Sequence, residues 1–250
     1  MSSPSPTDSS WTRERVVRAA SQRRAFDGLD LSGVDLRGLD LSGRSLRGTQ
    51  LRGANLGGTN FRAADLSGAN LDGAQYDPDA PTVFDDARLT GARLGRLVPS
   101  AGSWTGARLD RVSLVATDWS GLSLQRTSFL ESDLRDARFD GATLHRVEAD
   151  GANFSDARLD GSTWTHPSLD RATFSGASLR NATFERTVLS ADGLVGAAVA
   201  GASFDRVVLD DLDFGRLDVS PGDDDAAASA HSAEGCRFHA CSLRRATATQ

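Results

Sequence analysis

Large apolar side chains recur at every fifth position along most of the chain. The first units read LDLSG, VDLRG, LDLSG, RSLRG, TQLRG, ANLGG, TNFRA, ADLSG and ANLDG, and the Leu or Phe of each unit is called its centre below. One run of centres covers residues 26–76, a second covers 84–219, and Phe238 and Leu243 follow a break. All 11 Phe residues fall on centres, as do Tyr76, Trp104, Trp119 and Trp164, so the period is not an accident of composition.

The residue two positions before each centre is mostly small, with Ala in many units, and the other three positions are mainly Asp, Asn, Arg, Ser, Thr and Gly. A step of five turns a side chain by about 140° on an α-helix and flips it to the other face of a flat strand. Both arrangements would expose half of the centres. A chain that turns a corner once per unit keeps every centre inside, and a square coil closes after four units, with the next coil hydrogen-bonded about 4.8 Å away.

This coil predicts an all-β solenoid whose interior is lined by the centres and their small partners. The predicted core residues are Leu31, Leu36, Leu41, Leu46, Leu51, Leu56, Phe61, Leu66, Leu71, Phe84, Trp104, Trp119, Phe129, Phe139, Phe154, Trp164, Phe174, Phe184, Phe204 and Phe214. A spacing of 20 residues also predicts one interior column of stacked side chains: Phe84, Trp104, Leu124, Leu144, Trp164, Phe184 and Phe204.

The units resemble the A(D/N)LXX consensus of the pentapeptide repeat family, over roughly residues 26–245. The resemblance implies a right-handed quadrilateral β-helix, and its 41 centres correspond to about ten coils.

Interruptions of the repeat divide the chain. The residues before the first centre read as a short basic helix that covers the edge of the first coil. An insert with two prolines separates the two runs, and it is predicted to bulge outward, either without consequence or as a functional loop. Pro99 and Pro167 predict irregular coils. The predicted segments are a disordered 1–9, a helical cap at 10–25, repeats at 26–76, a loop at 77–83, repeats at 84–219, an acidic flexible loop at 220–235, final repeats at 236–245 and a tail at 246–250.

The formal net charge is −6, which argues against direct binding of nucleic acid, and all 28 basic residues are Arg. The chain has no apolar stretch of the length that a signal peptide or a membrane helix needs, so we expect a cytoplasmic protein. The two cysteines do not form a disulfide framework.

No catalytic, cofactor-binding or metal site is predicted. The sequence contains neither a phosphate-cradling glycine loop nor a GxSxG elbow. The best metal candidate combines His231, Cys236, His239 and Cys241. The repeat register places both cysteines in small inward positions and His239 outside, and side chains on opposite sides of one wall cannot share an ion. Small core side chains are therefore the favoured interpretation of both cysteines.

Charged residues form outward rows at 20-residue spacing. One row contains Asp110, Asp150, Asp170 and Asp210, interrupted by Leu130 and Ser190. Another contains Arg126, Arg146, Arg186 and Arg206, with His166 between them. Such rows either neutralise each other along the wall, which we favour, or display charge to a macromolecular partner.

The resemblance implies a function. Characterised members of the family resemble DNA in shape and charge, bind DNA gyrase and protect it from quinolones. The sequence therefore predicts a non-catalytic macromolecule-binding protein, with a DNA-mimicking binder of a type II topoisomerase as the specific hypothesis and a general protein-interaction scaffold as the alternative. The partner is expected to be a protein rather than nucleic acid or a membrane. The chain itself is expected to be a monomer or an end-to-end homodimer.

Overall fold

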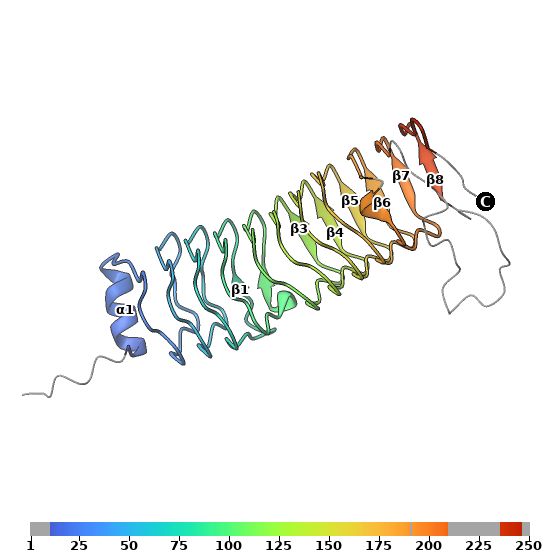
Figure 1. Cartoon of the computed structure of the whole chain (residues 1–250). Coiled ribbons are helices and arrows are strands. Elements are labelled where there is room, and N and C mark those ends of the chain that lie inside the picture. The colour runs from blue at the N-terminus through green and yellow to red at the C-terminus, as the bar shows by residue number, and fades with distance from the viewer. Residues whose placement is uncertain (1–10, 191, 210–235, 247–250) are drawn as a thin grey trace, which may run out of the picture. The chain divides into compact units, whose positions relative to one another are not determined.

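The computed structural model describes residues 11–190, 192–209 and 236–246, and the chain divides into two compact units, residues 1–103 and 104–250 (Figure 1). The segments 1–9 and 220–235, and the residues Asp210, Phe214 and His231, lie outside the described residues.

Each repeat unit makes a turn directly after its centre, and the second residue after the centre is left-handed. Gly28, with φ of 66°, and Arg126, with φ of 54°, are two examples. Successive coils join through backbone hydrogen bonds in both directions: Leu134 N donates to the Asn153 carbonyl at 2.8 Å, and Asn153 N donates to the Ser132 carbonyl at 2.9 Å. The coil therefore satisfies its polar backbone from turn to turn, as strands do in a parallel sheet.

The first unit begins with α1, residues Arg13–Ser21, which lies against the first coil (Figure 1). The side chain of Thr12 caps the helix by accepting from Arg15 N. Val16 and Ala19, three residues apart on one helix face, are buried. This small apolar stripe turns inward and leaves the charged side chains of the helix outside.

The sequence predicts an irregular loop over residues 77–83, and part of this segment is regular in the structure. Asp77 and Ala80 form an antiparallel bridge, and the chain regains the coil at β1, Thr82–Val83. Strand β1 pairs in parallel with β2, Gly102–Ser103, after the 3-10 turn η1 at Pro99–Ala101. The insert changes the pairing offset from 20 to 23 residues, as in the Asp65–Arg88 bridge. Pro99 is buried and starts the 3-10 turn, which accommodates its missing N–H.

The second unit forms one wall as a regular parallel sheet of six strands in the order β3-β4-β5-β6-β7-β8, with another 3-10 turn, η2, at Asp192–Leu194. The strands are β3 Ser123–Gln125, β4 Thr143–His145, β5 Thr163–Thr165, β6 Thr183–Glu185, β7 Ser203–Asp205 and β8 Arg237–His239. Each turn contributes one strand to this sheet, so its six strands correspond to six turns of the second unit. The sequence predicts about ten coils for the whole chain. The sheet shows fewer because the first unit joins most of its coils by isolated bridges and not by strands of this sheet.

The interior of the second unit is filled by the centres. In the sheet, Leu124, Leu144, Trp164, Phe184, Phe204 and Phe238 lie in register. The rings of Phe184 and Phe204 stack at 5.9 Å, and those of Phe204 and Phe238 at 5.2 Å. The sequence did not anticipate that a second column also stacks, with Phe154 and Phe174 at 5.0 Å and an interplanar angle of 4°.

The predicted core side chains that the structure describes are all buried. Those with no measurable exposure are Leu31, Leu36, Leu41, Leu46, Leu51, Leu56, Phe61, Leu66, Leu71, Phe84, Trp119, Phe129, Phe139, Phe154, Trp164 and Phe184. Trp104, Phe174 and Phe204 are exposed by at most 3%. Burial of one large and one small side chain per unit thus supplies the apolar stabilisation of both units.

Candidate functional site

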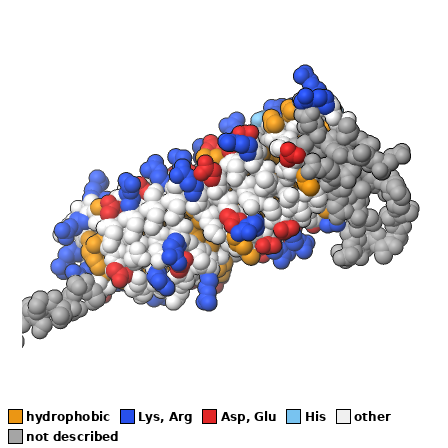
Figure 2. All heavy atoms as spheres, in the orientation of Figure 1, with side chains coloured by type: hydrophobic (Ala, Val, Ile, Leu, Met, Phe, Trp, Pro, Cys, Tyr) orange, Lys and Arg blue, Asp and Glu red, His pale blue; other side chains and the backbone are white. Residues whose placement is uncertain are grey.

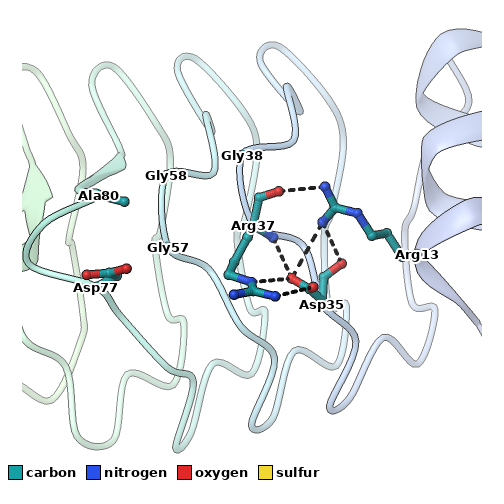
Figure 3. Close-up of a pocket in the computed structure, with 8 residues that line it drawn as sticks. All are labelled: Arg13, Asp35, Arg37, Gly38, Gly57, Gly58, Asp77 and Ala80. Carbon is teal, nitrogen blue, oxygen red and sulfur yellow. Dashed lines mark hydrogen bonds and ion pairs between the residues drawn. The ribbon is translucent and has the colours of Figure 1, made fainter.

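A hollow of about 490 Å³ lies on the surface of the first unit beside α1, where Arg37, Gly57 and Asp77 occupy the same position of three successive coils (Figure 3). Gly57 lacks a side chain, and a Cβ there would lie 2.9 Å from the Cβ of Asp77. The missing side chain creates the hollow, with a guanidinium on one side and a carboxylate on the other.

The polar groups of this hollow are largely bound to each other. Arg37 forms a two-pronged contact with Asp35 through Nε at 3.0 Å and Nη2 at 2.9 Å. Hydrogen bonds from the Arg37 side chain lower the pKa of Asp35 to about 2. Arg13 of α1 donates to the carbonyls of Asp35 and Arg37, at 3.1 and 2.8 Å (Figure 3). The group therefore fastens the helix to the coils, and we assign it a structural role.

The predicted row of aspartates is engaged in a repeated backbone contact. Asp150 Oδ1 accepts from the backbone N–H of Asp170 at 2.8 Å and from Ser168 Oγ at 2.7 Å. Asp110 is 5% exposed and accepts from the Ser128 hydroxyl. Only the outermost described member, Asp170, is exposed, and it pairs with Arg171 at 3.1 Å. Most of this row is thus used to hold neighbouring coils together, which leaves little charge for a partner.

The predicted basic row lies along one corner of the second unit. Arg126 N donates to the carbonyl of His145, Arg146 N to that of Thr165, and the same bond recurs at each later turn. Five residues occupy this corner on successive turns, about one strand spacing of 4.8 Å apart: Arg126, Arg146, His166, Arg186 and Arg206. We call these five residues the basic edge, and each of them a rung of that edge.

Every rung of the basic edge has a left-handed backbone, with φ between 52° and 57°. Glycine adopts this conformation freely, whereas another L-residue loses roughly 1–2 kcal/mol there. Stacked like charges in water repel by about 1 kcal/mol per neighbouring pair before salt screening. Gly141 and Gly161 hold the equivalent position on the adjacent corner, so the coil itself does not require a cation there.

Neighbouring acids compensate only one end of the basic edge. Arg186 contacts Glu185 at 3.6 Å, and Arg206 contacts Asp205 at 3.8 Å. Arg186 also donates to Nε2 of His166 at 3.1 Å, because a guanidinium has no acceptor. Within the described part of the chain, Arg126 and Arg146 form no ion pair, and both are exposed.

An acidic corner that the sequence analysis missed lies two sides of the coil away. Asp136 and Asp156 are exposed, left-handed at 59°, and occupy successive turns. Their 20-residue spacing is visible in the sequence. They are recognised as one row of charge only once the structure shows that the second residue after each centre forms a corner of the coil. Figure 2 shows charged side chains standing out, often in mixed groups, from a largely uncharged surface.

The three candidate metal ligands that the structure describes, Cys236, His239 and Cys241, do not converge. The thiols of Cys236 and Cys241 donate to the carbonyls of Val199 and Phe204, at 2.9 and 3.2 Å. His239 is exposed and lies 2.7 Å from Asp205. Burial raises the pKa of the Cys236 thiol, which disfavours the thiolate that zinc needs. No group of three or more metal-binding side chains occurs among the described residues.

A smaller basic hollow of about 220 Å³ lies between α1 and the first coil of the first unit. Trp11 packs edge-on against Phe26 at 6.0 Å, and the guanidinium of Arg15 lies 5.3 Å from the Trp11 ring. Arg18 and Arg24 also line it.

In the described segments, no helix is both long and apolar enough to cross a membrane.

Comparison with known proteins supports the fold. Residues 45–75, 107–146 and 152–190 match the family model "Pentapeptide repeats" in 8 copies. The structure is similar to that of HetL, a pentapeptide repeat protein involved in heterocyst differentiation regulation from the cyanobacterium Nostoc sp. Strain PCC 7120, with 21% identity over 95% of this chain and 94% of that one and a TM-score of 0.50.

A trypsin-treated form of QnrB1, a plasmid-mediated fluoroquinolone resistance protein, gives 15% identity over 90% of this chain and 89% of that one, with a TM-score of 0.44. No curated protein matches the chain. The likeness to HetL concerns the fold alone, because sequence identity is low and function in such scaffolds lies in surface residues.

Proposed function

Since this chain belongs to the pentapeptide repeat proteins, we propose that it is a non-catalytic protein that binds a macromolecular partner through the outward side chains of its coil. Pentapeptide repeat proteins are generally structural or binding proteins. The partner that we propose is a protein.

The observation that supports this proposal is the fixed register of the outward side chains. In the second unit, parallel pairing aligns Gln125 with His145 and Thr165 with Glu185, so each outward position repeats as a straight row on a rigid wall. Large flat surfaces of this kind suit macromolecules, whereas catalysis needs a cleft that excludes water. The hollow beside α1 is open to solvent, and the charged side chains Arg13, Asp35 and Arg37 of its lining are bound to one another in ion pairs.

A more specific hypothesis is that the protein mimics DNA and binds a type II topoisomerase such as gyrase, protecting it from poisons. The net charge of −6 and the acidic corner of Asp136 and Asp156 favour it. The hydrogen bonds that Asp110 and Asp150 accept from neighbouring coils weigh against it, because carboxylates that are hydrogen-bonded within the wall imitate phosphates poorly. A protein-interaction scaffold without DNA mimicry is therefore the interpretation that the geometry supports best.

Two measurements test the proposal. Immobilised protein is incubated with a bacterial lysate, and the retained proteins are identified by mass spectrometry. In parallel, DNA gyrase is assayed for supercoiling with and without ciprofloxacin in the presence of the protein. A specific protein partner supports the scaffold, and a change in supercoiling or drug sensitivity supports the topoisomerase hypothesis. Retention of nothing beyond background would contradict the proposed function.

Matched variants make the gyrase assay specific. Asp136→Asn with Asp156→Asn removes the acidic corner. The control, Glu131→Gln with Asp170→Asn, changes the charge equally at another corner, where both acids pair with Arg in the wild type. DNA mimicry predicts that the first pair loses the effect on supercoiling and the control keeps it. Equal behaviour of the two would reject the acidic corner as the mimic.

A further inference from the structure

The basic edge of the second unit differs from the other corners in carrying Arg or His on five successive turns, with no acidic residue among them. The next corner carries both signs of charge, and Arg111 pairs there with Glu131 of the following turn at 3.3 Å. On the basic edge, the neighbour of each rung is another Arg or His166. The fold therefore neutralises stacked charge at that corner, whereas on the basic edge it leaves the charges of Arg126 and Arg146 without an ion pair among the described residues.

The wall beside the basic edge offers hydrogen-bonding groups in a parallel row. Each strand of the six-stranded sheet from β3 to β7 begins with an outward hydroxyl. The row consists of Ser123, Thr143, Thr163, Thr183 and Ser203. Ser123 and Thr143 are exposed, and in the described residues their hydroxyls have no hydrogen-bond partner. These hydroxyls can donate to carbonyls or accept from N–H groups of a bound chain.

On these observations, we propose that the basic edge, together with the hydroxyl row of β3 to β7, binds an acidic polypeptide segment of a partner protein. This inference rests on the proposed function and names its partner chemistry. Arg126 and Arg146 are the principal contacts, since Glu185 and Asp205 already occupy the two Arg rungs further along. Guanidinium groups on a pre-ordered wall bind carboxylates through paired, charge-assisted hydrogen bonds.

An acidic polypeptide fits better than nucleic acid. The cations form a single row, and Glu185 and Asp205 lie directly beside it, where a broad duplex would place more phosphates. A polypeptide presents carboxylates along one edge and amide groups beside them, which matches a row of Arg next to a row of hydroxyls. The net charge of −6 also opposes a polyphosphate of high charge density.

The test uses the full chain and a fluorescein-labelled peptide rich in Glu and Gly, titrated by fluorescence anisotropy at low salt. The variant Arg126→Gly with Arg146→Gly removes the two unpaired rungs, and Gly suits their left-handed backbone, so the fold is retained. The control is Arg111→Gly with Arg171→Gly. It makes the same change of charge at another corner, where φ is also positive, at 55° and 54°.

The proposal predicts that the first variant binds the peptide about tenfold more weakly and that the control stays within about twofold of the wild type. It is overturned if wild type does not bind the peptide or if both variants lose binding equally. It is also overturned if labelled duplex DNA binds more tightly than the peptide through the same two Arg residues. Lysate capture separates the two levels: a protein partner that is retained equally by wild type and by Arg126→Gly with Arg146→Gly leaves the proposed function intact and rejects the basic edge.

Discussion

The carboxylate of Asp150 accepts a hydrogen bond from the backbone N–H of Asp170 in the next turn, with an N to Oδ1 distance of 2.8 Å. The same oxygen accepts from Ser168 Oγ. Two residues that the sequence places in one charged row therefore have different roles, because one carboxylate joins two coils and the other faces solvent.

This relationship predicts that Asp150→Ala destabilises the protein by about 1–2 kcal/mol, since the backbone N–H of Asp170 and the hydroxyl of Ser168 both lose their acceptor. Asp170→Ala is expected to change the free energy of unfolding by less than about 0.5 kcal/mol, because its pair with Arg171 is exposed. Urea unfolding followed by circular dichroism measures both variants. Equal destabilisation by the two would show that the contact of Asp150 is not the stabilising one.

The sequence was sufficient to predict the coil, because its period of five permits only one arrangement that buries every centre. It did not predict how outward residues are used. Asp110 and Asp170 have the same register, yet one is buried against a Ser hydroxyl and the other is exposed. The difference follows the residue 18 positions further along: Ser128 donates its hydroxyl to Asp110, whereas the corresponding residue for Asp170 is Val188, which has no hydroxyl to donate. The acidic corner of Asp136 and Asp156 was missed because the sequence analysis did not fix the second residue after each centre as a corner.

Acidification tests the contact of α1 with the coil. Hydrogen bonds from Arg37 lower the pKa of Asp35 to about 2, below the ordinary value of 3.8. The folded state thus holds the proton more weakly than the unfolded state, so this stabilisation is present above pH 3.8 and is lost as the pH falls towards about 2.

Asp35→Asn removes that dependence. The difference in melting temperature between wild type and Asp35→Asn is therefore expected to be greatest near neutral pH and to shrink towards about pH 2. Differential scanning calorimetry across this range measures it, and comparison with the variant cancels the titration of the other carboxylates. A difference that stays constant over the whole range would contradict the assigned role of the Asp35 carboxylate.

The hollow beside α1 predicts a steric effect at Gly57. Its backbone does not have a positive φ, so Ala is strained there only by the Cβ contact of 2.9 Å with Asp77. Gly57→Ala is expected to destabilise the protein by about 1–3 kcal/mol. Combining it with Asp77→Gly removes the clash and is expected to recover part of the loss in a double-mutant cycle. Additive effects in that cycle would mean that the two residues do not meet.

At the left-handed corners, replacing Gly is expected to destabilise the fold and introducing Gly is expected to stabilise it. Gly141 has φ of 64° and open space around its Cα, so Gly141→Ala is destabilising by about 1 kcal/mol through backbone strain alone. Arg146→Gly relieves that strain and also removes a repulsion, so it is expected to raise the free energy of unfolding by a similar amount at low salt, and by less at high salt as the repulsion is screened. Urea midpoints at two salt concentrations measure both. If Arg146→Gly is destabilising instead, then the basic edge stabilises the fold, and the argument that its charges are kept for a partner loses its physical basis.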